Sequence, residues 1–161
     1  PIHEGTNGIQ ALDLLGRKLA MSDGRGLDLL AEEIRSTGAT ASDDEVLRPH
    51  ADALATHLDA VVHTSALLLA RMQAGDVNLA LANASLHLDA MGQVVIAWQW
   101  LRQAIVAQRM LDAGNGDPDY LQGKVQVCHY FCRYELPRVN QLTELLNQID
   151  TTCADTPASW F

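Results

Sequence analysis

Histidine and cysteine are the residues of this chain whose spacing first invites a metal or redox interpretation. His50 and His57 are seven residues apart and could share one helix face, with Asp52 between them, and Cys128 and Cys132 are four apart. However, no two histidines have the i, i+4 spacing of a helical zinc site, and no Glu-x-x-His motif of a di-iron bundle occurs. We therefore predict no metal site. The histidines are expected to be exposed or capped, and the cysteines to pack as small apolar residues.

A carboxylate stands directly before a predicted helix start at the beginning of the chain. Glu4, Gly5 and Thr6 are followed by Asn7 and Gly8, and an apolar stripe with helical spacing begins at once. Thr6 can serve as the N-cap, and the free N–H groups of the first turn then suit an anionic group. A triplet this short also occurs as an ordinary loop and helix cap, so these residues alone leave both interpretations open.

The elements that would position these groups are all helices. The chain has 161 residues, enough for one domain with a core, and 48% are apolar but only 5% aromatic. Alanine and leucine dominate, and alternating β-branched runs are absent. Glycine and proline divide the apolar pattern into predicted helices at 6–20, 27–36, 43–74, 77–113 and 118–149.

Residue types at the predicted helix ends indicate how the long helices begin. Ser42 and Glu45 form the pattern of a capping box, and Pro49 either bends the entry of that helix or marks its true first turn. Asp76 is the expected cap of the next helix. Asp117 followed by Pro118 is an N-cap with a proline at the first helical position.

Apolar spacing within the long helices predicts their packing. From Leu47 to Met72 the apolar residues recur at steps of four and three, a heptad stripe that requires a partner helix. The segment 91–105 is apolar on nearly every side, which places it centrally or beneath another domain. Pro137 should kink the last helix. We predict an all-α, up-and-down antiparallel helical bundle with an extra N-terminal helix pair.

The charge of the chain excludes several function classes. The net charge is −9, which argues against nucleic-acid binding and against anionic membrane surfaces. No stretch approaches the roughly 20 apolar residues of a membrane span, and no signal-peptide pattern is visible. Three cysteines do not form a disulfide framework. These observations lead us to expect a cytoplasmic protein.

The segment 2–10, Ile-His-Glu-Gly-Thr-Asn-Gly-Ile-Gln, resembles the acyl-CoA dehydrogenase signature. The following Ala-Leu-Asp-Leu-Leu-Gly-Arg-Lys-Leu at 11–19 extends the similarity to the long, methylmercaptopropionyl-CoA dehydrogenase-like subclass, whose members carry an additional C-terminal helical domain. The segment 97–104, Ala-Trp-Gln-Trp-Leu-Arg-Gln-Ala, is similar to the central helix of that domain. The resemblance implies that residues 1–26 end the core helical domain and that residues 27–161 form the extra helical bundle.

This resemblance also implies a reaction and its residues. Members form the 2,3-double bond of an acyl-CoA, passing a hydride to FAD and then to an acceptor such as electron-transfer flavoprotein. Glu4 aligns with a catalytic base, Gly5 with the substrate site, and Thr6, Asn7 and Gly8 with cofactor contacts. The chain departs from the usual pattern at His3, where Tyr is common, and at Gly8, where many relatives have Gln.

The same resemblance implies a homodimer of a longer protein. The chain starts without Met and lacks the preceding domains that would hold most of the FAD, so we interpret it as a C-terminal fragment, inert in isolation. An alternative from another function class is a non-catalytic helical module for interaction or oligomerisation. An FAD-binding β domain upstream would distinguish the first interpretation from the second.

Overall fold

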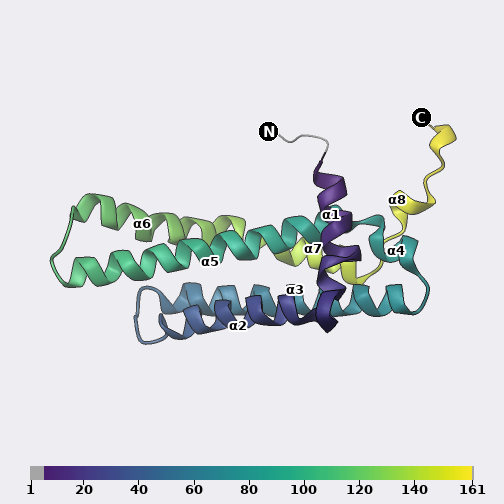
Figure 1. Cartoon of the computed structure of the whole chain (residues 1–161). Coiled ribbons are helices and arrows are strands. Elements are labelled where there is room, and N and C mark those ends of the chain that lie inside the picture. The colour runs from purple at the N-terminus through teal and green to yellow at the C-terminus, as the bar shows by residue number, and fades with distance from the viewer. Residues whose placement is uncertain (1–5, 161) are drawn as a thin grey trace.

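The computed structural model describes residues 6–160, and every regular element in that range is helical (Figure 1). The α-helices are α1 Asn7–Gly16, α2 Arg25–Ala39, α3 Arg48–Gln73, α4 Val77–Ala82, α5 Ala84–Asp112, α6 Pro118–Tyr130, α7 Arg138–Asn147 and α8 Thr152–Asp155. Short 3-10 helices span Lys18–Gly24 and Ala158–Trp160, and a π-helical turn spans Phe131–Glu135. The predicted all-α fold is confirmed.

The long helices lie side by side with alternating direction, as the up-and-down prediction requires (Figure 1). The central helix is α5, which packs against α1, α2, α3, α6 and α7. The two N-terminal helices take different positions: α2 runs along α3, whereas α1 stands across the bundle and packs mainly on α5. The core is one continuous cluster of leucine, alanine, valine and isoleucine side chains drawn from all of these helices.

The entry of α3 differs from the predicted capping box. Ser42 donates its hydroxyl to the Ala39 carbonyl at 2.7 Å, so it is not available as a cap. Asp44 Oδ1 instead accepts the Val46 and Leu47 backbone N–H groups at 2.8 and 3.0 Å in the turn that leads into α3, and the N-cap residue Leu47 has no side-chain cap hydrogen bond. The helix then starts with proline in its first turn, as one of the two predicted alternatives for Pro49 required.

The helix predicted over 77–113 is interrupted at Asn83. The residue has φ −113° and ψ 30°, and it separates the short α4 from α5. Its side-chain Nδ2 donates to the Asp150 carbonyl at 2.8 Å, so the break is hydrogen-bonded to the segment that follows α7. The single-helix prediction was therefore wrong here, since a contact 67 residues away stabilises the break.

The helix predicted over 118–149 begins and bends where the sequence indicated. Gly114 and Gly116 adopt positive φ in the preceding turn, and Asp117 caps α6 by accepting the Asp119 and Tyr120 N–H groups. Before Pro137 the helix widens into the π turn, where the Leu136 N–H donates to the Phe131 carbonyl at 2.9 Å. Proline cannot supply the next N–H, so the predicted kink takes the form of this turn.

The burial of side chains tests two further predictions, on membrane spanning and on the apolar segment 91–105. By length and composition alone α3 could span a membrane, but its apolar residues Leu54, Leu58 and Leu68 are buried in the bundle, as in a core helix. The segment 91–105 is central but not covered on every side, because Ile96 is exposed; farther along α5, Val106 is 56% exposed. One face of α5 therefore remains open to solvent.

Candidate functional site

The first turn of α1 is the described part of the predicted site. The helix begins at Asn7, directly after Thr6, and the Thr6 carbonyl accepts the Gln10 N–H at 2.9 Å. Thr6, Asn7 and Gly8 are all exposed, and a Cβ added at Gly8 would meet no atom within 4 Å. Two of the predicted site residues, Glu4 and Gly5, lie outside the described residues, as does His3.

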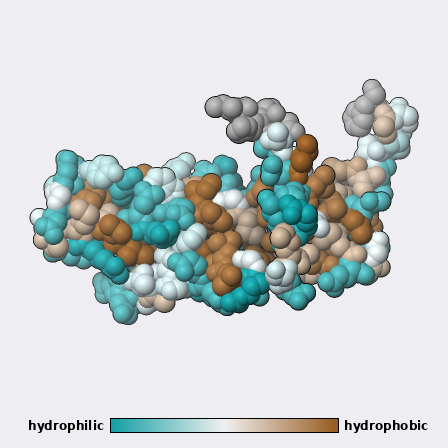
Figure 2. Space-filling view, in the orientation of Figure 1, coloured by the Kyte–Doolittle hydropathy of each residue, from teal (hydrophilic) through white to brown (hydrophobic). Residues whose placement is uncertain are grey.

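The remainder of α1 fixes the position of this turn. Ala11 and Leu15 are buried in the core, and Gly16 faces α4, where an added Cβ would make ordinary contact with Leu81 at 3.5 Å. The opposite face carries Ile9, which is 66% exposed, and the exposed Leu12. The N-terminal end of α1 consequently projects beyond the bundle (Figure 1), and apolar surface lies beside it in Figure 2.

The charges on α1 are paired away from its first turn. Asp13 accepts two hydrogen bonds from Arg17, at 2.6 and 3.1 Å, and lies 3.1 Å from Lys18 Nζ. The hydrogen bonds from Arg17 and Lys18 lower the pKa of the Asp13 carboxyl. Chemically, the start of α1 places a helix N-terminus beside apolar surface, an arrangement that suits a partly anionic, partly apolar group.

A second cluster with possible chemistry, Ser65 and His87, is buried in the core. The Ser65 hydroxyl donates to the Val61 carbonyl at 2.7 Å, so His87 Nε2, 2.8 Å away, must donate its N–H to the Ser65 oxygen. Burial lowers the pKa of His87 to about 4, and its Nδ1 has no partner. Because the Ser65 hydroxyl already donates to a backbone carbonyl and both side chains are buried, we assign the Ser65–His87 pair a structural role.

The remaining histidines differ in part from the prediction, whereas the two α6-side cysteines pack in the core as expected. His50 meets His129 edge-to-face at 5.2 Å, and His57 Nδ1 lies 2.7 Å from the Ala53 carbonyl. His50 and His57 are buried, unlike the exposed positions expected for histidines, but in residues 6–160 no three His, Cys, Asp or Glu side chains gather as a metal site. The cysteines of α6 and the π turn are buried together in the core.

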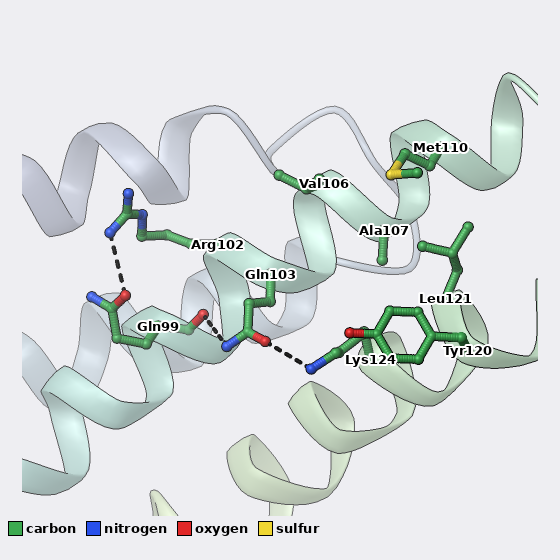
Figure 3. Close-up of a pocket in the computed structure, with 9 residues that line it drawn as sticks. All are labelled: Gln99, Arg102, Gln103, Val106, Ala107, Met110, Tyr120, Leu121 and Lys124. Carbon is green, nitrogen blue, oxygen red and sulfur yellow. Dashed lines mark hydrogen bonds between the residues drawn. The ribbon is translucent and has the colours of Figure 1, made fainter. Parts of the chain in front are cut away.

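A surface groove lies elsewhere, between α5 and α6 (Figure 3). It has a volume of about 460 Å³, and its lining includes Arg102, Val106, Met110, Tyr120 and Lys124. Sequence reasoning missed this groove because it interpreted α5 as uniformly covered. The available signal was an outer stripe on the same helix with heptad spacing, formed by positions 96, 99, 103, 106 and 110.

Comparison with known proteins places most of the chain in one family. Residues 30–157 match the family model described as acetyl-CoA dehydrogenase C-terminal like. This segment includes α3 to α7 and most of α2, and it leaves out α1 with its candidate site.

Two curated relatives are similar over nearly the whole chain. The broad-specificity linear acyl-CoA dehydrogenase FadE5 of Mycobacterium tuberculosis is 30% identical over 156 residues, which cover 92% of this chain and 26% of that protein. The 3-methylmercaptopropionyl-CoA dehydrogenase of Ruegeria pomeroyi is 34% identical over 143 residues, covering 84% of this chain and 23% of that protein. The chain thus spans about a quarter of the length of these relatives.

Proposed function

This chain belongs to the acyl-CoA dehydrogenase C-terminal-like family, and on that premise we propose that it is the C-terminal part of an FAD-dependent acyl-CoA dehydrogenase. Residues 1–26 would end the catalytic helical domain, and residues 27–161 would form the extra helical bundle. The observation that supports catalysis is the Glu4-Gly5-Thr6 motif directly before the helix start at Asn7.

In the proposed reaction Glu4 acts as the general base. Its carboxylate removes the proton from the α-carbon of the acyl-CoA and becomes the carboxylic acid. The electron pair left on the α-carbon forms the 2,3-double bond as a hydride leaves the β-carbon. FAD, when bound, would accept that hydride. Desolvation of Glu4 beside the acyl chain would raise its pKa toward the value that proton abstraction requires. Gly5, which has no Cβ, would leave space for the thioester.

The described residues fit a contact with the cofactor. Thr6, Asn7 and Gly8 are exposed at the start of α1, and the space around Gly8 is open. First-turn N–H groups could donate to phosphate oxygens, whereas Ile9 and Leu12 offer apolar surface for the upstream domains to cover. In this proposal the partners are an acyl-CoA substrate, an acceptor such as electron-transfer flavoprotein, and a second copy of the full-length protein in a homodimer.

Replacing the proposed base tests this function in the full-length protein that carries the chain. Glu4→Gln keeps the shape of the side chain and removes its basicity. Turnover should fall by the roughly 10²–10⁴-fold typical of a lost general base, with the flavin spectrum and substrate affinity little changed. Anaerobic addition of acyl-CoA should leave the flavin oxidised. Glu45→Gln is the matched control, because Glu45 is exposed beside the α3 entry.

Flavin reduction at a near wild-type rate in Glu4→Gln would place the base on another residue and leave only the family assignment. The isolated chain supplies a second measurement. Because the upstream domains would hold most of the cofactor, purified residues 1–161 should be colourless and inactive with acyl-CoA. Stoichiometric flavin absorbance on the purified chain would contradict this division of the site.

A second function, a non-catalytic module for protein interaction, is favoured by one observation. The outer face of α5 remains uncovered by the helices packed around it and carries exposed apolar side chains at Ile96 and Val106. This function is compatible with the first, because it concerns the helical bundle and not the start of α1.

A further inference from the structure

The outer face of α5 has the spacing of a helix-pairing seam. Ile96, Gln99, Gln103, Val106 and Met110 follow one another at steps of three and four, the a and d positions of a heptad. The three apolar members are all exposed, although neighbouring side chains on the opposite face of α5 are fully buried. The seam is therefore apolar at both ends and amide-lined in the middle, and no described helix covers it.

Together the seam and the neighbouring α6 form a groove rather than a flat surface. Tyr120 and Lys124 extend from α6 along one side of the groove, as Figure 3 shows, and Leu121 of the same helix also lines it. Lys124 Nζ lies 5.3 Å from the ring centroid of Tyr120 and 5.5 Å from that of Trp100, so these aromatic rings support the cation. Grooves between helix ridges are the surfaces into which another helix packs.

Unpaired cations border the groove on both sides. Arg102 and Lys124 line the groove from α5 and α6, and Arg109 is not in its lining but occupies the next g position of the α5 heptad after Arg102. None of the three forms an ion pair with a carboxylate of the described residues. Of the five cations that form no ion pair with a described carboxylate, these three lie along the seam, and Arg48 and Arg133 lie elsewhere.

The contacts that these cations do make are with neutral groups. Arg102 Nη1 donates to Gln99 Oε1 at 3.2 Å and lies over the Trp98 ring, and Lys124 Nζ donates to Gln103 Oε1 at 3.1 Å. Amide oxygens satisfy a donor but do not neutralise its charge. The acidic side chain nearest in sequence to Arg109, Asp112, instead accepts the amide of Gln108 at 3.0 Å.

We propose that the α5–α6 groove binds an amphipathic helix of a partner protein that carries apolar residues at its a and d positions and carboxylates on both flanks. The apolar residues would cover Ile96, Val106 and Met110, and the carboxylates would pair with the bordering cations. A second copy of this chain fits less well. Two α5 helices packed antiparallel would place the arginines of the g positions against each other, which is repulsive.

A designed peptide of about three heptads, with Leu at a and d and Glu at e and g, tests the proposal on the 161-residue chain. Its matched control has Lys in place of every Glu. We expect the Glu peptide to bind at least about 10-fold more tightly than the Lys peptide in titration calorimetry, with the difference shrinking as salt rises. Methyl NMR signals of Val106 and Met110 should shift on binding.

Charge reversal sharpens the test. The triple variant Arg102→Glu, Arg109→Glu and Lys124→Glu should no longer bind the Glu peptide and should bind the Lys peptide instead. Circular dichroism should report the same helix content as in the wild-type chain. Arg48→Glu, an exposed arginine outside the groove, should bind like the wild-type chain. Flavin chemistry does not enter this measurement, so its result is independent of the role of Glu4.

Three outcomes would overturn the proposal. The first is equal affinity for the two peptides, which would remove the role of the cations. The second is a set of NMR shifts outside the groove. The third is concentration-dependent dimerisation of the chain that Val106→Asp abolishes, since the occupant would then be a second copy.

Discussion

The two longest helices, α3 and α5, carry the same apolar spacing but use it differently. In α3 the stripe that includes Leu54, Leu58 and Leu68 faces inward and is covered by α2, α5 and α7. In α5 one apolar stripe is buried in the same core, and a second heptad stripe on the outer face, apolar at Ile96, Val106 and Met110, is exposed at those residues. A heptad pattern thus indicates that a helix has a surface to cover, but not whether this chain supplies the cover. Mutations that separate buried from exposed heptad positions test that comparison.

The largest effect is expected for a buried heptad position of α3. Leu58 is 0% exposed, so Leu58→Ala removes methyl groups from a packed interior and leaves a cavity. The free energy of unfolding should fall by about 2–5 kcal/mol, measured by urea denaturation. Leu29→Ala on the exposed side of α2 is the control and should change it far less. A loss below about 1 kcal/mol at Leu58 would mean that α3 is not packed as described.

A buried polar group beside the α3 stripe should make stability depend on pH. His87, on α5, hydrogen-bonds to Ser65 of α3, and its pKa is lowered from 6.5 to about 4 by burial. The unfolded chain therefore binds a proton below pH 6.5 that the folded chain does not take up until about pH 4. Stability should decline as pH falls through this window, by about 3 kcal/mol in total.

Replacing the histidine isolates this contribution. His87→Leu should flatten the decline between pH 6.5 and 4 without removing it, because burial also lowers the pKa of His50. His63→Leu, at an exposed position of α3, is the matched substitution for comparison. An unchanged slope in His87→Leu would show that His87 is readily protonated in the folded protein.

A smaller effect is expected where α2 joins α5 through one hydrogen bond. Trp98 Nε1 donates to Thr37 Oγ1 at 2.8 Å across the two helices. Thr37→Val keeps the side-chain volume and leaves the half-buried indole N–H without its acceptor, at a cost of about 1 kcal/mol in unfolding free energy. Thr56→Val serves as control, since its hydroxyl bonds only within α3. Equal effects of both variants would mean that the inter-helix bond contributes nothing measurable.

The smallest effect is expected at the exposed heptad position Val106. Val106→Ser removes apolar area that is already 56% exposed, so the free energy of unfolding should change by no more than about 0.5 kcal/mol, measured by thermal unfolding. The same variant should nevertheless lower the affinity of the chain for the Glu peptide, which covers this residue in the proposed complex. Destabilisation comparable to that of Leu58→Ala would show that the outer face of α5 is packed and not free.

Local signals in the sequence were sufficient to predict much of this fold. Asp117 caps α6 and Pro137 distorts the last helix as expected, because both effects depend only on nearby backbone groups. The break at Asn83 was not predictable in this way, since its stabilising acceptor is the carbonyl of Asp150. The capping box predicted at Ser42 does not form, because the serine hydroxyl donates to the Ala39 carbonyl, and Asp44 instead stabilises the turn before α3.

The parts of the candidate site also differ in whether local sequence could predict them. The start of α1 at Thr6 followed from residue types, and it depends only on local structure. The role of Glu4 came from a resemblance and remains a prediction. The heptad stripe on the outer face of α5 indicated a surface to be covered, but not whether this chain covers it, because apolar residues at Ile96 and Val106 are compatible with either a buried or an exposed face.

The π turn at Phe131–Glu135 determines which face of α7 points toward the core. Each added residue turns a helix by about 100°, so the wider turn rotates α7 relative to α6 about their common axis. This rotation accounts for the difference in their partners: α6 packs on α5, whereas Val139 and Leu146 of α7 are buried between α5 and α3. Deleting one residue in this turn would move that buried face toward solvent, so chain length here should tolerate insertions and deletions far less than the Gly114–Gly116 turn does.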